Sequence, residues 1–167
     1  MTRHYTYLLL GSNIGDRENH FEYAISRLNA EAGTVVKISS FYETAPWGVT
    51  GQQNYLNAAL LLETELGPGK LFHILKNIEK EAGRTDLRKY APRPLDIDIL
   101  FYDDEVIKTN ELTIPHDKLH LRRFTLVPLN ELAPAFHHPV LNKSIAALLE
   151  ACEDPLEVKL IGHSKIS

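Results

Sequence analysis

The segment APRPLDIDILFYDD, from Ala91 to Asp104, combines an apolar strand pattern with two acidic side chains. Successive side chains of a strand point to opposite faces, so Asp96 and Asp98 project from one face, roughly 6–7 Å apart. The opposite face is expected to hold the apolar side chains of Leu95, Ile97, Ile99 and Phe101. The pattern therefore predicts a strand that presents two like charges side by side.

Two interpretations of the acidic pair remain open. Both carboxylates can simply be solvated on an open sheet face. Alternatively, a bound divalent cation removes the repulsion between them. Carboxylate oxygens without cysteine partners suit Mg²⁺, and two carboxylates at this spacing can bridge a pair of ions in a phosphoryl-transfer site.

Arginines occur on both sides of the acidic strand. They are Arg84, Arg88 and Arg93 before it, and Arg122 and Arg123 after it. Arginine binds phosphate through a bidentate fork, although surface ion pairs that contribute little stability are an alternative. Because Pro92 and Pro94 restrict the backbone around Arg93, a positioning role is favoured there. Together the acidic pair and the basic loop suggest a metal–nucleotide site.

Other residues suggest how a flat heterocycle would be held. Tyr55 and Asn57 alternate on one face of a predicted strand, and Phe124 follows Arg122 by two positions. Such rings can stack on a heterocycle while an amide contacts its polar edge, but aromatic residues near strand ends are more often part of the core. The segment from Gly11 to Asp16, GSNIGD, lacks the lysine of a P-loop, so a turn with a helix cap is favoured over a phosphate site.

These residues lie on elements in the order β-α-β-β-α-β. Strands are predicted over 5–12, 34–44, 55–64 and 95–102, with helices from Asp16 to Gly33 and from Pro68 to Gly83. The later elements expected are a tight hairpin turn at Asp103 and Asp104, a short strand ending at 112–116, a short helix after an extended arginine pair, and a helix over 141–152. The order predicts an α+β, ferredoxin-like βαββαβ sandwich with additional C-terminal strands and helices.

The composition sets broad limits on the class of protein. The 167 residues, 44% hydrophobic and 24% charged, predict a single soluble domain over 1–167. A net charge of −4 argues against nucleic acid as a partner, and one cysteine excludes an intrachain disulfide. The N-terminal apolar run is too short for a signal peptide or membrane span, so a cytoplasmic protein, without a membrane partner and monomeric, is expected.

Several segments together resemble a known family. The run KYAPRPLDIDIL, from Lys89 to Leu100, looks like the signature of 6-hydroxymethyl-7,8-dihydropterin pyrophosphokinases. Further blocks resemble that family in the same order: LGSNIGDR, SSFYETAPWG, YLNAAL, IEKEAGR, LTIPH and RRFTLVPLNELAP. The resemblance covers nearly the whole chain, from about Tyr5 to about Glu150.

The resemblance implies transfer of pyrophosphate from ATP to the pterin hydroxymethyl group, in folate biosynthesis, with Asp96 and Asp98 holding two Mg²⁺ ions. It implies a pterin site formed by Thr44, Pro46, Trp47, Tyr55, Asn57 and Phe124. It implies an ATP site formed by Lys76, Glu79, Arg84, Arg93, His116 and Arg122, of which Arg84, Arg93 and His116 would be catalytic. His120, His137 and His138 match no role and are expected at the surface.

Two other functions compete with this interpretation. A small-molecule-binding regulatory module on a ferredoxin-like fold would not need the acidic pair together with Arg93. A Mg²⁺-dependent nuclease would use the acidic pair, but the net acidity and the lack of a basic track argue against it.

Overall fold

The structure is a computed structural model that describes residues 2–45, 51–83 and 91–163. Its main strands are β1 (His4–Ser12), β2 (Thr34–Ile38), β3 (Phe41–Thr44), β4 (Tyr55–Thr64), β5 (Asp96–Tyr102) and β8 (Lys159–Gly162). Short strands β6 (Ile107–Lys108) and β7 (Thr113–Ile114) form a separate pair. The helices are α1 (Arg17–Glu31), α2 (Pro68–Glu81), α3 (Arg123–Leu132) and α4 (Ile145–Ala151), with one 3₁₀ turn at Leu119–Leu121.

The central sheet is antiparallel throughout and has the order β5-β1-β4-β3-β8, with β2 also paired to β4. Strands β2 and β3 lie one after the other along the same edge of β4, so together they occupy one strand position. The predicted βαββαβ order, with strands and helices added after it, is confirmed.

Two serines make the break between β2 and β3. The backbone N–H of Ser39 donates to the carbonyl of Ala59 at 2.8 Å, and the Ser39 hydroxyl accepts from the N–H of Ala59 at 2.9 Å. The backbone N–H of Ser40 donates to the Glu131 carboxylate of α3 at 2.9 Å. These bonds let the chain bend without leaving buried backbone groups unpaired, and the bend directs β3 toward α3.

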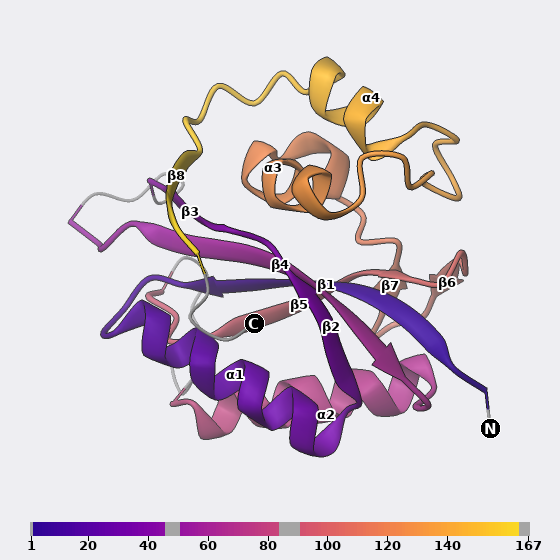
Figure 1. The fold of residues 1–167 in the computed structure, drawn as a ribbon, viewed down its shortest axis with the longest axis horizontal. Coiled ribbons are helices and arrows are strands. Elements are labelled where there is room, and N and C mark those ends of the chain that lie inside the picture. The colour runs from indigo at the N-terminus through magenta and orange to yellow at the C-terminus, as the bar shows by residue number, and fades with distance from the viewer. Residues whose placement is uncertain (1, 46–50, 84–90, 164–167) are drawn as a thin grey trace.

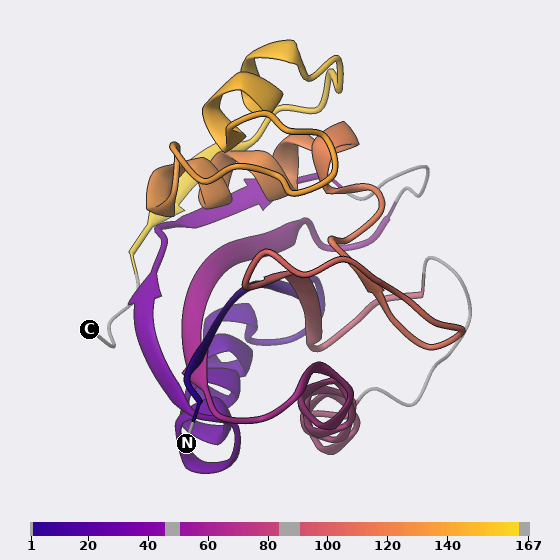
Figure 2. The same cartoon turned by 90° about the vertical axis from the view of Figure 1, so that its right-hand side faces the viewer.

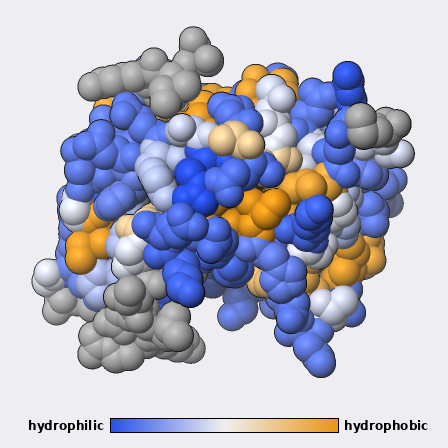
Figure 3. All heavy atoms as spheres, turned by 90° about the horizontal axis from the view of Figure 1, so that it is seen from below, coloured by the Kyte–Doolittle hydropathy of each residue, from blue (hydrophilic) through white to orange (hydrophobic). Residues whose placement is uncertain are grey.

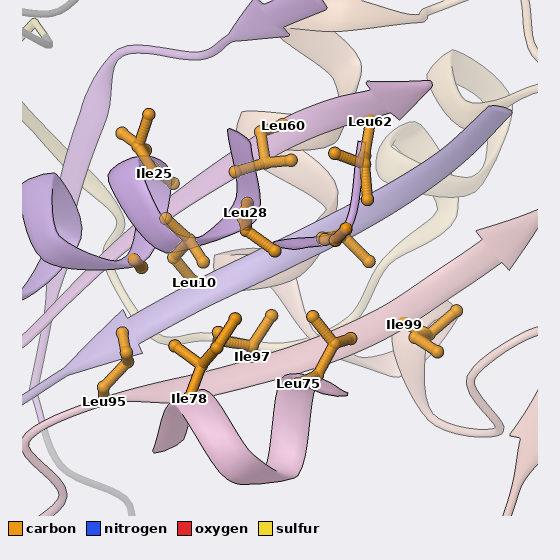
Figure 4. Packing of buried hydrophobic residues seen from close by; sticks show 14 of the residues in the cluster. Leu10, Ile25, Leu28, Leu60, Leu62, Leu75, Ile78, Leu95, Ile97 and Ile99 are labelled. Atoms are coloured by element: carbon orange, nitrogen blue, oxygen red, sulfur yellow. The ribbon is translucent and has the colours of Figure 1, made fainter. Parts of the chain in front are cut away.

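Helices cover both faces of the sheet (Figures 1 and 2), with α1 and α2 on one face and α3 and α4 on the other. Asp16 caps α1 by accepting from the N–H of Asn19 at 3.1 Å, as predicted. Figure 4 shows the larger core, in which side chains of α1 and α2 meet one face of β1, β4 and β5. A second core lies under α3 and α4. The sheet is therefore buried on both sides over much of its length.

Strand β5 departs from the predicted alternation at one point. Leu95, Ile97 and Ile99 lie in the larger core as expected, but Phe101 lies in the second core with Leu100. Tyr7 pairs with Phe101 and Leu8 with Ile99, so Leu100 is an extra residue in the ladder. This bulge turns Phe101 to the opposite face. The placement of Phe101 on the same face as Ile97 was wrong for that reason.

Other parts of the C-terminal half differ from the expectations. The turn after β5 is confirmed, since the Glu105 N–H donates to the Tyr102 carbonyl. The prediction of a hairpin at this turn was wrong, because β6 pairs with β7 and not with β5. Arg122 is extended whereas Arg123 already begins α3, and the last helix covers only Ile145–Ala151. Strand β8 was not predicted at all.

The exterior over α1 and α2 is mostly hydrophilic, with smaller areas of hydrophobic side chains between (Figure 3). Within the described ranges, no helix combines the length and the apolar character needed to cross a bilayer.

His138 was expected at the surface, but it is only 5% exposed. Its Nδ1 accepts from the N–H groups of Val140 at 3.1 Å and Leu141 at 3.0 Å, and its ring contacts Phe101 edge-on. An imidazole that accepts at Nδ1 carries its proton on Nε2 and is neutral. Burial, and then the neighbouring His120, lower the pKa of His138.

This lowered pKa predicts a loss of stability in acid. The unfolded chain binds the proton more readily than the folded one, so the contribution of neutral His138 is complete above its unfolded pKa of about 6.5 and is lost as the pH falls. His138→Asn keeps an acceptor oxygen without titrating. The melting temperature of the variant is expected to fall less than that of the wild type between about pH 7.5 and pH 5.5. Identical falls would contradict the role of His138.

Candidate active site

The site is organised around Gly11, near the end of β1. Gly11 pairs with Asn57 of β4 on one side and with Asp96 of β5 on the other. A Cβ at this position would lie 3.1 Å from Nδ2 of Asn57, 3.8 Å from Cβ of Asp96 and 3.9 Å from Cδ1 of Tyr55. A glycine here therefore leaves room for the side chains of both neighbouring strands, which the interpretation of GSNIGD as a turn did not anticipate.

A cavity of about 520 Å³ opens at this place. Its walls come from the ends of β1, β3, β4 and β5, from the segment between β7 and α3, from the start of α3 and from the tail after α4. Among the predicted residues, those lining it are Thr44, Tyr55, Asn57, Asp96, Asp98, Arg122 and Phe124. The structure thus brings the proposed metal residues and most of the proposed pterin residues to one cavity.

The carboxylates of Asp96 and Asp98 are both half-buried on the cavity side of β5. Nη1 of Arg93 lies 3.3 Å from Oδ1 of Asp96, with the Arg93 side chain 17% exposed. A pair of carboxylates facing a cavity, supplied by a rigid strand, fits the oxygen ligands that Mg²⁺ prefers. The residues present therefore suit a divalent metal ion.

Asn13 fixes the loop that carries Arg93. Its side-chain oxygen accepts from the Arg93 N–H at 2.7 Å, and its own N–H donates to the Arg93 carbonyl at 2.9 Å. Its amide nitrogen also donates to Oε1 of Gln52 at 3.0 Å, and Gln52 lines the cavity. Asn13 is 1% exposed. No local sequence pattern indicates this role, because the partners of Asn13 lie far along the chain.

Glu79 lies beneath β5 rather than in the cavity wall. It is 2% exposed, and its Oε2 accepts from the N–H of Ile97 at 2.7 Å. Nζ of Lys76 lies 3.3 Å from its Oε1. Ile97 stands between the two aspartates, so the carboxylate of Glu79 holds the backbone that presents them.

The opposite side of the cavity carries the ring-binding candidates. Asn57 is 3% exposed, and its amide nitrogen donates to the Leu10 carbonyl at 3.3 Å, while its oxygen accepts from the Thr44 hydroxyl at 3.4 Å. These two bonds fix the direction of the amide. Phe124 and Tyr55 line the same cavity, and the Arg122 guanidinium lies 5.6 Å from the centre of the Phe124 ring.

His116 lies beside this group, outside the cavity lining. Its Nδ1 accepts from the Lys118 N–H at 3.3 Å, which leaves the proton of the neutral ring on Nε2. Burial lowers the pKa of His116, and the positive charge of Arg122 lowers it further. At neutral pH the ring is therefore uncharged and can donate one hydrogen bond.

The remaining predicted residues are Arg84, Pro46 and Trp47, and all three lie outside the described residues. Lys76 is exposed on α2 and contacts the Phe72 ring as well as Glu79.

Together the fold and the site define a ferredoxin-like α+β protein with a carboxylate pair beside an aromatic-lined cavity. The family described as 7,8-dihydro-6-hydroxymethylpterin-pyrophosphokinase (HPPK) matches residues 7–134. The chain therefore belongs to the HPPK family.

Curated relatives support this membership. A 2-amino-4-hydroxy-6-hydroxymethyldihydropteridine pyrophosphokinase of Aquifex aeolicus is 45% identical over 139 residues, which is 83% of this chain and 86% of that protein. The mitochondrial folate synthesis bifunctional protein of Arabidopsis thaliana is 47% identical over 131 residues, which is 78% of this chain. The match covers only 24% of the length of that bifunctional protein.

Solved structures agree on the fold. A crystal structure of Plasmodium falciparum HPPK-DHPS with pteroate superposes with a TM-score of 0.75 at 18% identity, over 89% of this chain and 42% of that one.

The position of Glu79 leads to a stability prediction. Glu79→Ala leaves the buried N–H of Ile97 without this acceptor and is expected to lower the free energy of unfolding by about 1–3 kcal/mol. Glu79→Gln keeps an oxygen in place and is the matched control, with a smaller loss. Urea titrations of both variants measure the difference. An equal loss in the two variants would mean that the bond to Ile97 is not what Glu79 contributes.

Proposed function

We propose that this chain transfers pyrophosphate from ATP to the hydroxymethyl group of 6-hydroxymethyl-7,8-dihydropterin, giving AMP and the pterin diphosphate, in folate biosynthesis. The observation that carries the proposal is the joining of two half-sites at Gly11, with the carboxylates of β5 on one side and Asn57 and Tyr55 of β4 on the other. Membership of the HPPK family supports the choice of reaction.

Asp96 and Asp98 would hold Mg²⁺, two ions in this proposal. When bound, the metal neutralises phosphate charge and polarises the groups that react. The two carboxylates fit this role because they share one strand face and border the cavity. Their mutual repulsion, unfavourable in the free protein, favours binding of a cation.

The side chains of β4 and α3 would bind the pterin. Tyr55 and Phe124 border the cavity and would stack on the two faces of the ring. Asn57, directed by Thr44 and the Leu10 carbonyl, would contact its polar edge. Pro46 and Trp47 would complete this wall. Holding the ring fixes the direction of its hydroxymethyl group toward ATP. The entropy of aligning the two reactants is then lost mainly when the pterin binds, and adds little to the barrier of the chemical step.

Arginines and His116 would bind the phosphates. Arg93, fixed through Asn13, and Arg122, above Phe124, both carry permanent positive charge next to the cavity. His116 would donate from Nε2. Arg84 would be a third phosphate ligand, with Lys76 and Glu79 on the nucleotide side.

The chemical step then requires positioning more than covalent work. The pterin hydroxyl oxygen forms a bond to the β-phosphorus of ATP as the bond from that phosphorus to the α,β-bridging oxygen breaks. AMP leaves with the bridging oxygen, and the hydroxyl proton is released. The positive charge of Arg93 and Arg122 stabilises the charge that shifts to the leaving phosphate.

We further propose that residues 1–167 act as one domain, as a monomer, in the cytoplasm. The relatives include both proteins of similar length and proteins about three times as long, so further domains in a longer chain would be compatible with the same site.

One assay tests the reaction directly. The protein is incubated with ATP, Mg²⁺ and 6-hydroxymethyl-7,8-dihydropterin, and the products are separated. AMP together with the pterin diphosphate supports the proposal. ADP as the nucleotide product, or binding of the pterin without turnover, would overturn it, the latter in favour of a binding module.

The acidic pair provides a second test. Asp96→Asn and Asp98→Asn keep the size of each side chain but remove its charge, and each is expected to lower turnover by about two orders of magnitude or more at unchanged melting temperature. Asp104→Asn, an exposed aspartate in the turn after β5, is the matched control. Near-normal turnover in both Asp96→Asn and Asp98→Asn would contradict the metal assignment.

A further inference from the structure

The tail after α4 forms part of the cavity wall. Asp154 and Pro155 line the cavity together with Arg122 and Phe124. These tail residues lie beyond residue 134, where the match to the family ends. The tail then continues to β8, which pairs with β3, and β3 ends at Thr44, another residue of the cavity. The tail therefore connects the start of α3 with the edge strand β3, and both border the cavity.

Arg123 connects this tail to the start of α3. Its Nε donates to the Asp154 carbonyl at 3.0 Å, and one terminal nitrogen donates to the Cys152 carbonyl at 2.9 Å. Its backbone N–H donates to the Asp154 carboxylate at 3.1 Å. The side chain of Arg123 therefore binds the tail and does not line the cavity.

Asp154 also performs the role that a cap residue usually has. Arg122, at the N-cap position of α3, makes no side-chain capping bond. The Asp154 carboxylate instead accepts from the first N–H of the helix, where the helix dipole favours a negative charge. Its other oxygen accepts from Leu156 N–H at 3.0 Å, which fixes the carboxylate within the tail.

The junction between Arg123 and Asp154 holds Arg122 and Phe124, which are proposed to contact the phosphates and the pterin. Arg122 and Phe124 flank Arg123 directly, and the Arg122 guanidinium lies over the Phe124 ring. A first helical turn without its cap and without the Arg123 bonds would be free to fray. The ring of Phe124 and the charge of Arg122 would then move together.

We propose that Arg123 and Asp154 are positioning residues for the pterin site, which clamp the C-terminal tail to α3 and so fix Phe124 and Arg122 at the cavity. The proposal rests on the proposed function, since the pterin is the ligand whose binding it concerns. The clamp acts on the α3 side of the cavity and leaves Asp96, Asp98 and Arg93 on the β5 side untouched.

The test measures the affinity for the pterin by isothermal titration in the presence of Mg²⁺ and α,β-methylene ATP, whose bridging carbon blocks the reaction. Arg123→Ala and Asp154→Ala are each expected to raise the Kd for 6-hydroxymethyl-7,8-dihydropterin about tenfold, as partial loss of an aromatic stacking contact would. Because both changes break one junction, the double variant is expected to be little weaker than the worse single variant.

Control variants separate positioning from mere packing. Glu153→Gln removes a charge from the neighbouring, exposed tail residue and is expected to bind the pterin like the wild type. Asp154→Asn keeps an acceptor oxygen and is expected to recover most of the affinity. In turnover assays the KM for the pterin is expected to rise, and kcat is expected to fall as well, because the proposed chemical step also uses the positive charge of Arg122. Should Arg123→Ala fail to fold, Arg123→Lys keeps one donor and is expected to weaken binding by a smaller factor.

The outcomes are distinct. If Arg123→Ala and Asp154→Ala lower the melting temperature but bind the pterin as tightly as Glu153→Gln does, the tail contributes packing only and the clamp proposal is overturned while the proposed function stands. If the wild-type protein binds no pterin and produces no AMP, the proposed function fails and the clamp proposal fails with it.

Discussion

The pairing of β1 with β4 and β5 is the constraint on which the site depends. Each pairing places one functional side chain next to Gly11, the amide of Asn57 from β4 and the carboxylate of Asp96 from β5. Directly paired residues of an antiparallel sheet lie about 4.5–5.5 Å apart. The register therefore brings the carboxylate of Asp96, which suits a metal ion, and the amide of Asn57 into one cavity. No flexible loop lies between them. A shift of either pairing by one residue would turn one half-site into the core.

The same strand serves the core and the site, and its two faces depend on each other. Ile97 and Ile99 pack against α2 while Asp96 and Asp98 face the cavity. The buried carboxylate of Glu79 reaches from α2 to the backbone of Ile97, in the middle of the acidic pair. A buried anion is costly unless it is hydrogen-bonded and paired. The Glu79 carboxylate accepts from the N–H of Ile97 and lies near the ammonium group of Lys76. The helix that buries the strand thus also holds the backbone of the acidic pair in place.

Local patterns predicted the elements and the acidic pair well. Period-2 alternation placed Asp96 and Asp98 on one face because no irregularity occurs between them, and Asp16 capped α1 because a cap depends on residues only three apart. The same alternation failed at Phe101, since the bulge at Leu100 depends on the partner strand β1. The contacts of Asn13 and Arg123 were missed because their partners are distant in sequence. Strand β8 was missed because its pairing with β3 spans most of the chain.

We propose that the carboxylates of β5 hold a metal ion beside the ring site of β4 and α3. To test this metal site, Mg²⁺ is replaced with paramagnetic Mn²⁺, and the proton resonances of 6-hydroxymethyl-7,8-dihydropterin are recorded in exchange with the protein and α,β-methylene ATP. Strong broadening of the hydroxymethyl proton resonances is expected with the wild-type protein, and this broadening is expected to be lost in the Asp96→Asn/Asp98→Asn double variant. Pterin that binds the wild-type protein without broadening, or broadening that persists in the double variant, would contradict the proposed metal site.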